Sequence, residues 1–226
     1  MTPVPVSRID HLAVTAPMLQ AGAAWVEQVP GVVPQPAGKH PQMGTHNVLL
    51  RLGDDVYLEV IAIDPAAAPP GRPRWFDLDT LRADTPPRLR SWIARCTDIH
   101  ATLAAAGENL GPVSAMHRGD LQWLITIPDD GKPLMGGTAP ALIERKSAPH
   151  PASRLLNHGL RLEALELFHP RPHRLMALIE AMGMDAQVRV RRSPDGEDSS
   201  LVAPVATPRG LRRLDADVSA AGNGHA

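Results

Sequence analysis

Three titratable side chains inside apolar strands are the residues of this sequence best suited to chemistry. Glu59 interrupts the stretch VYLEVIAI, Glu144 interrupts PALIERK, and His11 lies in RIDHLAVT. An ionised carboxylate in a buried strand is costly unless a cation or hydrogen-bond donors compensate it. One imidazole and two carboxylates from separate strands suit a borderline divalent metal that keeps open positions for a substrate. We therefore predict that these three side chains converge on one cation.

Two further histidines are candidates for the same site. His46 stands at the start of HNVLLRL as a candidate ligand, and His40 precedes it in GKHPQMGTHN as a less favoured one. The prolines between His169 and His173 argue against a helical i, i+4 ligand pair. We interpret that pair as part of a polar turn between a strand and a helix.

Sharp catalytic motifs are absent from the sequence. It contains no GxSxG, HExxH, P-loop or glycine-rich dinucleotide fingerprint, which removes most support for hydride and phosphoryl transfer. A hydrolase built on Ser91 or Cys96 is disfavoured, because a single cysteine flanked by apolar residues usually belongs to the core. Since the chain has few aromatic rings, Trp25, Trp92 and Trp123 are candidates for lining a substrate pocket.

The composition indicates a globular protein with a small-molecule partner. Of 226 residues, 43% are hydrophobic and 21% are charged, so the chain can bury a core. Lysine and arginine number 23 against 24 acidic residues, and the net charge of -1 gives no field to attract nucleic acid or a membrane surface. One cysteine excludes an internal disulfide framework. With no signal-peptide pattern and no window of about 18 apolar residues, we expect a cytoplasmic location.

Two segments of the chain show the same order of predicted elements. In residues 7–63, an alternating strand, a helix and three short extended stretches form a βαβββ module. Residues 91–147 repeat this plan, with a strand at SWIARC and a helix that Thr97 or Asp98 would cap and Gly107 would end. The pattern therefore predicts an α+β protein built from paired βαβββ modules.

The remaining segments join or extend these modules. The Pro-rich stretch 64–90 is predicted to be a connector without regular structure. Residues 155–214 show strand, helix and strand patterns, which form either a C-terminal βαβ extension or a partial third module. In the second case Glu163 or Glu166 would compete with the acid of the second module for the inner face. Residues 215–226 have too little apolar content to fold, and we expect a disordered tail.

Three stretches of the sequence resemble a known family. RIDHLAVTAP followed by a helix, GKHPQMGTHNVLLRLGDDVYLEVIAIDP, and PALIER ahead of His150 and Pro151 are similar to the glyoxalase-like domain branch of the vicinal oxygen chelate superfamily. The resemblance covers roughly residues 7–190. It implies that the paired modules form curled mixed sheets around a metal site.

The resemblance also implies a set of ligands for a divalent metal ion such as Zn, Ni, Fe or Mn. Members of the superfamily bind the cation with one residue from the first strand and one from the last strand of each module, which carries over to His11, Glu59 and Glu144. The remaining position falls on Ser91, whose neutral hydroxyl is a poor ligand. We therefore expect three ligands, with His46 or a water molecule completing the shell.

For function, the resemblance implies a metal-dependent enzyme acting on a small molecule with vicinal oxygens. A cation that binds two adjacent oxygens stabilises the charge of an enolate, so lyase- or isomerase-type proton transfer is favoured, with Glu59 or Glu144 as the base. A ring-cleaving dioxygenase would need two histidines and one carboxylate around iron, which His46 could complete. A non-catalytic protein that sequesters or senses a small molecule is the other alternative, and Ser91 favours it. A homodimer is compatible with each of these functions.

Overall fold

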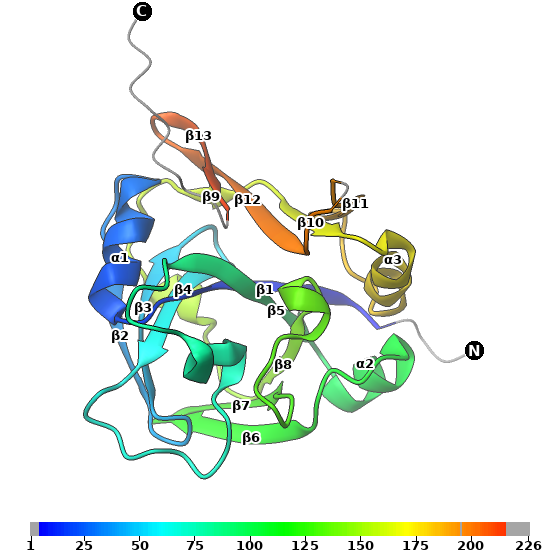
Figure 1. The fold of residues 1–226 in the computed structure, drawn as a ribbon, viewed down its shortest axis with the longest axis horizontal. Coiled ribbons are helices and arrows are strands. Elements are labelled where there is room, and N and C mark those ends of the chain that lie inside the picture. The colour runs from blue at the N-terminus through cyan, green and yellow to red at the C-terminus, as the bar shows by residue number, and fades with distance from the viewer. Residues whose placement is uncertain (1–4, 195, 216–226) are drawn as a thin grey trace, which may run out of the picture.

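Eight strands form one continuous curled sheet in the structure, a computed structural model that describes residues 5–194 and 196–215 (Figure 1). The strands are β1 (Ser7–Thr15), β2 (Gln35–His40), β3 (Thr45–Arg51), β4 (Tyr57–Ile63), β5 (Arg88–Cys96), β6 (Val113–Arg118), β7 (Leu121–Thr126) and β8 (Ala141–Arg145). Their order across the sheet is β2-β3-β4-β1-β5-β8-β7-β6. Strands β1 and β5 pair antiparallel at the centre, while β1 runs parallel to β4 and β5 parallel to β8.

The two halves of this sheet are related by a two-fold arrangement. Helix α1 (Leu19–Gln28) follows β1, and helix α2 (Ile99–Ala106) follows β5, so each half is a βαβββ unit. Leu12 pairs with Trp92 at the centre, and the flanking pairs are His11 with Ile93 and Ala13 with Ser91. Ser91 is therefore the counterpart of His11. The predicted α+β fold with paired βαβββ modules and a curled mixed sheet is confirmed.

Local sequence signals explain where the helix of the second half begins and ends. The Asp98 side chain accepts a hydrogen bond from the backbone N of Ala101 at 2.9 Å, as a helix cap does. Gly107 follows the helix with φ of 66°, a left-handed conformation that glycine adopts without steric cost. Of the two residues expected to cap this helix, Asp98 is the one that does so.

The segment between the two halves is more ordered than predicted. Strand β5 begins at Arg88, within the expected connector, and a 3-10 turn η1 (Trp75–Thr80) places the Trp75 and Phe76 side chains in the interior. Phe76 and Asp77 have φ of 58° and 62°, values that cost a non-glycine residue about 1–3 kcal/mol. Burial of the two rings and an ion pair of Asp77 with Arg90 hold this turn in place.

The C-terminal region forms a second sheet with a different order. It contains β9 (Arg161–Leu162), β10 (Leu165–His169), α3 (Pro172–Ala181), β11 (Val188–Arg192), β12 (Ser200–Thr207) and β13 (Gly210–Leu214). The order is β11-β10-β12-β13, with β9 also paired to β12. Because β11 lies directly beside β10, this region differs from the two modules, where the strand after the helix lies at the far edge. Glu166 stays within this sheet, paired with Arg191.

The large sheet separates two hydrophobic clusters. Side chains such as Leu12, Leu58 and Trp92 pack with residues of α1, α2, α3 and the second sheet, on what we call the convex face. Alternate residues such as Ala13 and Ile93 belong to another cluster, on the concave face. Period-2 alternation therefore decides which residues can reach a site inside the curl.

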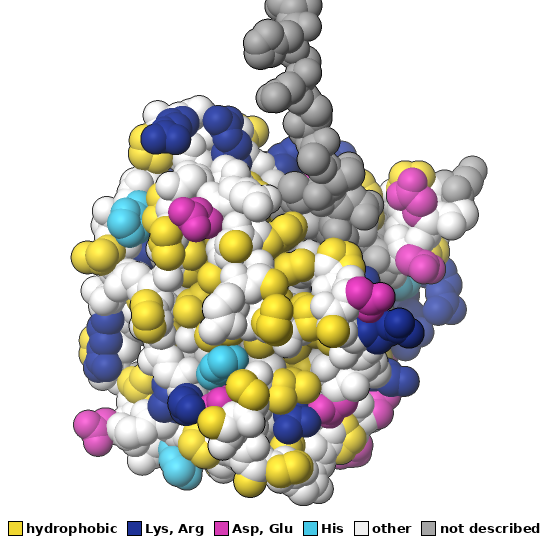
Figure 2. Space-filling view, turned by 60° about the vertical axis from the view of Figure 1, so that its left-hand side comes forward, with side chains coloured by type: hydrophobic (Ala, Val, Ile, Leu, Met, Phe, Trp, Pro, Cys, Tyr) yellow, Lys and Arg dark blue, Asp and Glu magenta, His cyan; other side chains and the backbone are white. Residues whose placement is uncertain are grey.

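The surface carries no single-sign field on the face shown in Figure 2, where basic and acidic side chains are interspersed. This agrees with the net charge of -1. Within residues 5–194 and 196–215, none of the helices has the length and apolarity needed to cross a membrane. Of the predicted tail 215–226, residues 216–226 lie outside the described residues.

Substitution of Gly22 by alanine is expected to destabilise the protein, although alanine favours helices by about 1 kcal/mol. A Cβ at Gly22 would lie 2.5 Å from Val60 Cγ1 and 2.8 Å from Ala16 Cβ, so α1 must move off β4, at a cost of about 1–3 kcal/mol. The free energy of unfolding in urea measures this. In a Val60→Ala background the penalty should shrink, and a Gly22→Ala protein more stable than the wild type would contradict the packing described.

Candidate active site

A β-bulge in the first strand turns two consecutive polar side chains toward each other. Ile9 pairs with Ala94 and His11 pairs with Ile93, so Asp10 is an extra residue without a partner on β5. Bulges of this kind re-aim side chains and often lie next to active sites. Asp10 Oδ1 lies 2.6 Å from His11 Nδ1, and the two side chains are 0% and 6% exposed.

The Asp10 carboxylate is the centre of a buried polar cluster. Arg145 donates to both carboxylate oxygens, with Nε 2.8 Å from Oδ2, and His150 Nε2 lies 3.1 Å from Oδ2. Arg145 also donates to the Tyr57 hydroxyl at 2.9 Å, and the Tyr57 ring stacks on His11 with centroids 4.5 Å apart. Burial raises the pKa of Asp10, but these hydrogen bonds and the Arg145 charge outweigh it and hold the pKa well below its usual value.

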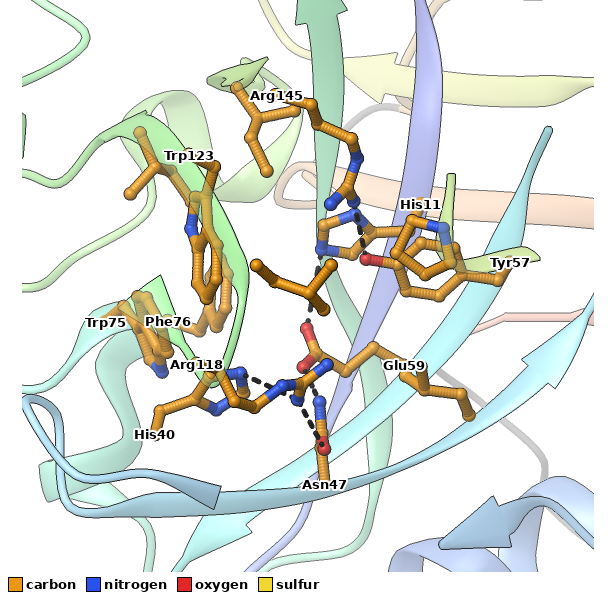
Figure 3. Close-up of a pocket in the computed structure, with 15 residues that line it drawn as sticks. His11, His40, Asn47, Tyr57, Glu59, Trp75, Phe76, Arg118, Trp123 and Arg145 are labelled. Carbon is orange, nitrogen blue, oxygen red and sulfur yellow. Dashed lines mark hydrogen bonds and ion pairs between the residues drawn. The ribbon is translucent and has the colours of Figure 1, made fainter. Parts of the chain in front are cut away.

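On its other side, the imidazole of His11 faces Glu59. His11 Nε2 lies 3.4 Å from Glu59 Oε2, and the Asn47 amide donates to Oε1 of the same carboxylate. Burial raises the pKa of Glu59, but the hydrogen bond and charge of His11 lower it to about 2. Burial lowers the pKa of His11, whereas Asp10 and Glu59 raise it above its ordinary value. The array favours an imidazolium between the carboxylates of Asp10 and Glu59; Figure 3 shows His11 with Glu59.

A second cation, Arg118, lies near this array. Its Nη1 atom is 3.4 Å from both His40 Nε2 and Asn47 Oδ1, which are long contacts for a guanidinium. No carboxylate pairs with Arg118 within the part of the chain that the structure describes. Burial and the charges of Arg118 and His11 lower the pKa of His40 to about 4, so His40 is neutral at pH 7 and accepts from Arg118. Because Nη1 makes only these two long contacts with described residues, the guanidinium can still bind an anionic group through its other nitrogens.

Aromatic rings form the wall opposite the His11 array (Figure 3). Trp75 and Phe76 come from η1 and Trp123 from β7. Together with the polar groups they enclose a pocket of about 490 Å³, counting the space at its open mouth. Its lining is His11, His40, Asn47, Leu49, Tyr57, Glu59, Trp75, Phe76, Arg118, Leu121, Trp123, Ile125, Ile143, Arg145 and Pro151.

Glu144 is not part of this pocket, contrary to the prediction. Its carboxylate accepts a hydrogen bond from the Ile99 backbone N at 3.0 Å, at the start of α2, and pairs with Lys146. Alternation along β8 places Leu142 and Glu144 on the convex face and Ile143 and Arg145 on the concave face. An arginine therefore enters the site where the sequence analysis expected a carboxylate.

His46, the more favoured of the two additional histidine candidates, does not line the pocket. It lies on β3 between Thr45 and Asn47, and it is Asn47 that lines the pocket. The histidine that does line it is His40, the less favoured of the two candidates. His40 is the last residue of strand β2. The sequence around it, GKHPQMGTHN, does not alternate between apolar and polar residues, so the pattern could not show which side chains of this strand face the pocket.

The residues present do not fit the predicted divalent metal site. Glu59 pairs with Ala13, and the corresponding pair in the second half is Ala141 with Ile93. The counterparts of His11 and Glu59 are therefore Ser91 and Ala141, which offer no ligand suited to Zn, Ni, Fe or Mn. No group of three His, Cys, Asp or Glu side chains arranged to hold a metal ion occurs among the described residues. His11 and Glu59 supply two donors, fewer than the three protein ligands typical of catalytic zinc, and the Nε2 atom of His40 faces the Arg118 guanidinium.

Only one of the three predicted tryptophans lines the pocket. Trp123 does so, whereas Trp92 is fully buried on the convex face, where its Nε1 donates to the Thr138 carbonyl at 2.8 Å. Trp25 packs against the convex cluster from α1. The sequence analysis missed Trp75 and Phe76 because they lie in the expected connector, where no periodicity assigns a face.

Cys96 does not form a nucleophilic site. Its thiol lies 3.6 Å from the Ile143 carbonyl oxygen, and burial raises the thiol pKa to about 11. Ser91 is buried and lines a small apolar pocket with Trp75 and Phe76. This agrees with the low standing that the sequence analysis gave to a hydrolase.

Comparisons with known proteins agree with the fold. A family model described as a glyoxalase-like domain matches residues 9–183. The crystal structure of a hypothetical protein from Staphylococcus aureus superimposes with a TM-score of 0.57 at 10% identity, covering 86% of this chain and 88% of that one. Methylmalonyl-CoA epimerase from Mycobacterium tuberculosis is 16% identical with a TM-score of 0.40, covering 66% and 93% of the two chains. Curated proteins gave no match.

Elemental analysis of protein purified without chelator should find fewer than about 0.1 transition-metal ions per chain, because a catalytic site needs about three protein ligands. Titration with zinc should give the same weak binding for the wild type and for His11→Gln. Stoichiometric metal that is lost in His11→Gln would contradict the two-donor site described here.

The pKa of the His11 imidazole should lie above its ordinary value of 6.5. An NMR titration measures it, and the signal that is missing from the spectrum of His11→Gln identifies His11. Asp10→Asn and Glu59→Gln should each lower this pKa, since each removes a negative neighbour. A raised folded-state pKa contributes stability that is fully present below the unfolded value and is lost as pH rises through the folded value. Wild-type stability should therefore fall more than that of His11→Gln as pH rises from 6.5 through the folded-state pKa, and a His11 pKa below 6.5 would refute the array.

Proposed function

We propose, since this chain belongs to the glyoxalase-like domain family, that its pocket transfers a proton on a small molecule with neighbouring oxygens. The observation that carries the proposal is the buried array of Asp10, His11 and Glu59 beside an aromatic wall. Titratable groups with shifted pKa values that share a cleft are typical of acid–base sites. The reaction class is the isomerase or lyase type favoured by the sequence, but the charge is stabilised by protein cations in place of a metal.

The contact between His11 and Glu59 is long enough to be exchanged for a contact with a substrate oxygen. At 3.4 Å their contact is loose, so a carbonyl oxygen can accept a hydrogen bond from His11 Nε2 in place of the carboxylate. Glu59 then loses the interaction that lowers its pKa and becomes a stronger base. It removes a proton from the carbon next to the carbonyl, and the negative charge that develops on the oxygen is stabilised by His11 and Arg118. Return of the proton to carbon or oxygen completes an isomerisation.

Each polar neighbour has a positioning function in this scheme. Asp10 fixes the His11 ring through Nδ1 and favours its protonated form, while the stacked Tyr57 ring limits its rotation. Asn47 holds one oxygen of Glu59 and contacts Arg118 with its own carbonyl oxygen. The aromatic wall excludes water, which strengthens the electrostatic interactions inside the pocket.

The sequence left two alternatives to a proton-transfer enzyme open, a ring-cleaving dioxygenase and a non-catalytic binding protein. A ring-cleaving dioxygenase would need a second histidine beside His11, and the candidate His46 lies on the opposite face of β3. A non-catalytic binding protein is favoured by one observation, the pKa of about 2 for Glu59, because such a carboxylate is a weak base before a ligand enters. The cytoplasmic location and the homodimer stay predictions.

Deuterium exchange tests proton transfer directly. When the protein is incubated in D2O with 2-oxo acids or 2-hydroxy ketones, the hydrogen on the carbon next to the carbonyl should be replaced by deuterium. NMR measures the rate of this replacement. Glu59→Gln should lower the exchange rate about 100-fold or more, the size expected for loss of a general base. The matched control Glu144→Gln should keep the wild-type rate, since that acid lies on the convex face. Ligand binding without exchange would overturn the enzyme in favour of the binding protein.

A further inference from the structure

A groove continues from the pocket to the protein surface. Its volume is about 670 Å³, counting open space, and it shares Leu49, Arg118, Leu121 and Pro151 with the pocket. The other walls come from β2 and from the segment 149–155. These four residues line both spaces, so the pocket and the groove adjoin at Arg118 and its neighbours.

The groove is lined mainly by apolar residues, with one neutral polar side chain, Gln35, and two arginines. Pro36, Ala37 and Leu155 supply apolar surface, and no aspartate or glutamate lines it. Arg118 lies at the junction with the pocket, and Arg154 is an exposed residue of the groove wall. Neither guanidinium forms an ion pair with a carboxylate in the described ranges 5–194 and 196–215. This lining complements an apolar chain that carries a negative charge.

The charges of the pocket also leave room for one anion. With His11 protonated, the site contains three cations, His11, Arg118 and Arg145. It contains two carboxylates, those of Asp10 and Glu59, so one positive charge is in excess. The excess lies at Arg118, because Arg145 is already bonded to Asp10. Trp75 offers a further donor, since its buried Nε1 has no partner among the described residues.

Asn47 sets the distance between the anion and the reacting carbon. One amide bridges Glu59 and Arg118, with Nδ2 on the carboxylate and Oδ1 3.4 Å from Nη1. A ligand carboxylate on Arg118 therefore lies one small group away from the base. The carboxylate and keto oxygen of a 2-oxo acid are neighbours of this kind, and the keto oxygen would then reach His11.

We propose that the pocket and groove together bind 2-oxo acids with long apolar substituents. The carboxylate binds Arg118, the keto oxygen accepts from His11, and the apolar chain follows the groove between β2 and the segment 149–155. The reaction that this placement supports is keto–enol isomerisation. Glu59 takes the proton from C3, the C3–H electron pair forms the C2–C3 double bond, and the carbonyl π pair moves to the oxygen, which takes a proton from His11. The proton on Glu59 then passes to His11, 3.4 Å away, and restores both groups. The chemical step rests on the proposed function, whereas the binding mode does not.

Isothermal titration calorimetry with matched ligands tests the binding mode. The probes are 2-oxododecanoate, its methyl ester and 2-oxobutanoate. The long acid should bind at least about tenfold more tightly than the short acid, since each buried CH2 adds affinity. Arg118→Gln should weaken binding of both acids about tenfold or more and leave the ester unchanged. The control Arg82→Gln, at an exposed arginine paired with Asp84, should change none of these values.

Two groove variants separate the chain from the carboxylate. Ala37→Phe narrows the groove and Leu155→Ser removes apolar surface from its wall; either should reduce the preference for the long acid while the short acid binds as in the wild type. If Ala37→Phe does not fold, the affinities of Leu155→Ser for the long and the short acid are enough to test the groove. Equal affinity for long and short acids, or for the acid and its ester, would overturn the inference.

The same ligands distinguish this inference from the proposed function. Tight, chain-dependent binding of 2-oxododecanoate without deuterium exchange would refute the reaction and support the binding mode. Exchange on 2-oxobutanoate with no gain from chain length would refute the groove and leave the reaction intact.

Discussion

A carboxylate with no exposure to solvent, that of Asp10, connects three elements of the chain around the site. It binds the neighbouring His11 on β1, Arg145 at the end of β8, and His150 at the start of the segment that covers the groove. Removing one partner from a buried ion pair typically costs about 3–5 kcal/mol, because the other charge remains unpaired. The bulge at Asp10 is what makes these contacts possible, since regular alternation would send the side chains of consecutive residues to opposite faces.

The two modules have different functions in the pocket although they share one fold. The first supplies the array of His11, Glu59 and Asn47. The second has Ser91 and Ala141 at the positions that correspond to His11 and Glu59, and it contributes apolar side chains and two arginines. Trp75 and Phe76, from the segment between the modules, line a small apolar pocket together with Ser91 and Ala141. The site is thus asymmetric, with an acid–base group on one side and an apolar wall with cations on the other.

The order of elements and three pocket residues, His11, Glu59 and Trp123, could be predicted from the sequence because their signals are local. Alternation predicted the strands, Asp98 and Gly107 marked the second helix, and an acid inside VYLEVIAI identified Glu59. The rest of the site depends on which face of a strand is concave, which periodicity alone does not reveal. Glu144 and Arg145 are consecutive, so an error of one position exchanges a carboxylate for a guanidinium. The bulge at Asp10 is a tertiary feature of the pairing between β1 and β5, without a signal in the sequence.

The central claim is that protein cations, rather than a metal, hold the oxygens of an anionic ligand beside Glu59. A crystal structure with bound 2-oxododecanoate, grown in the presence of zinc and measured at the zinc edge, tests it most directly. We predict the ligand carboxylate on Arg118, the keto oxygen on His11 Nε2, and no anomalous peak between His11 and Glu59. An anomalous peak bonded to both of these side chains, or a ligand carboxylate away from Arg118, would contradict the claim.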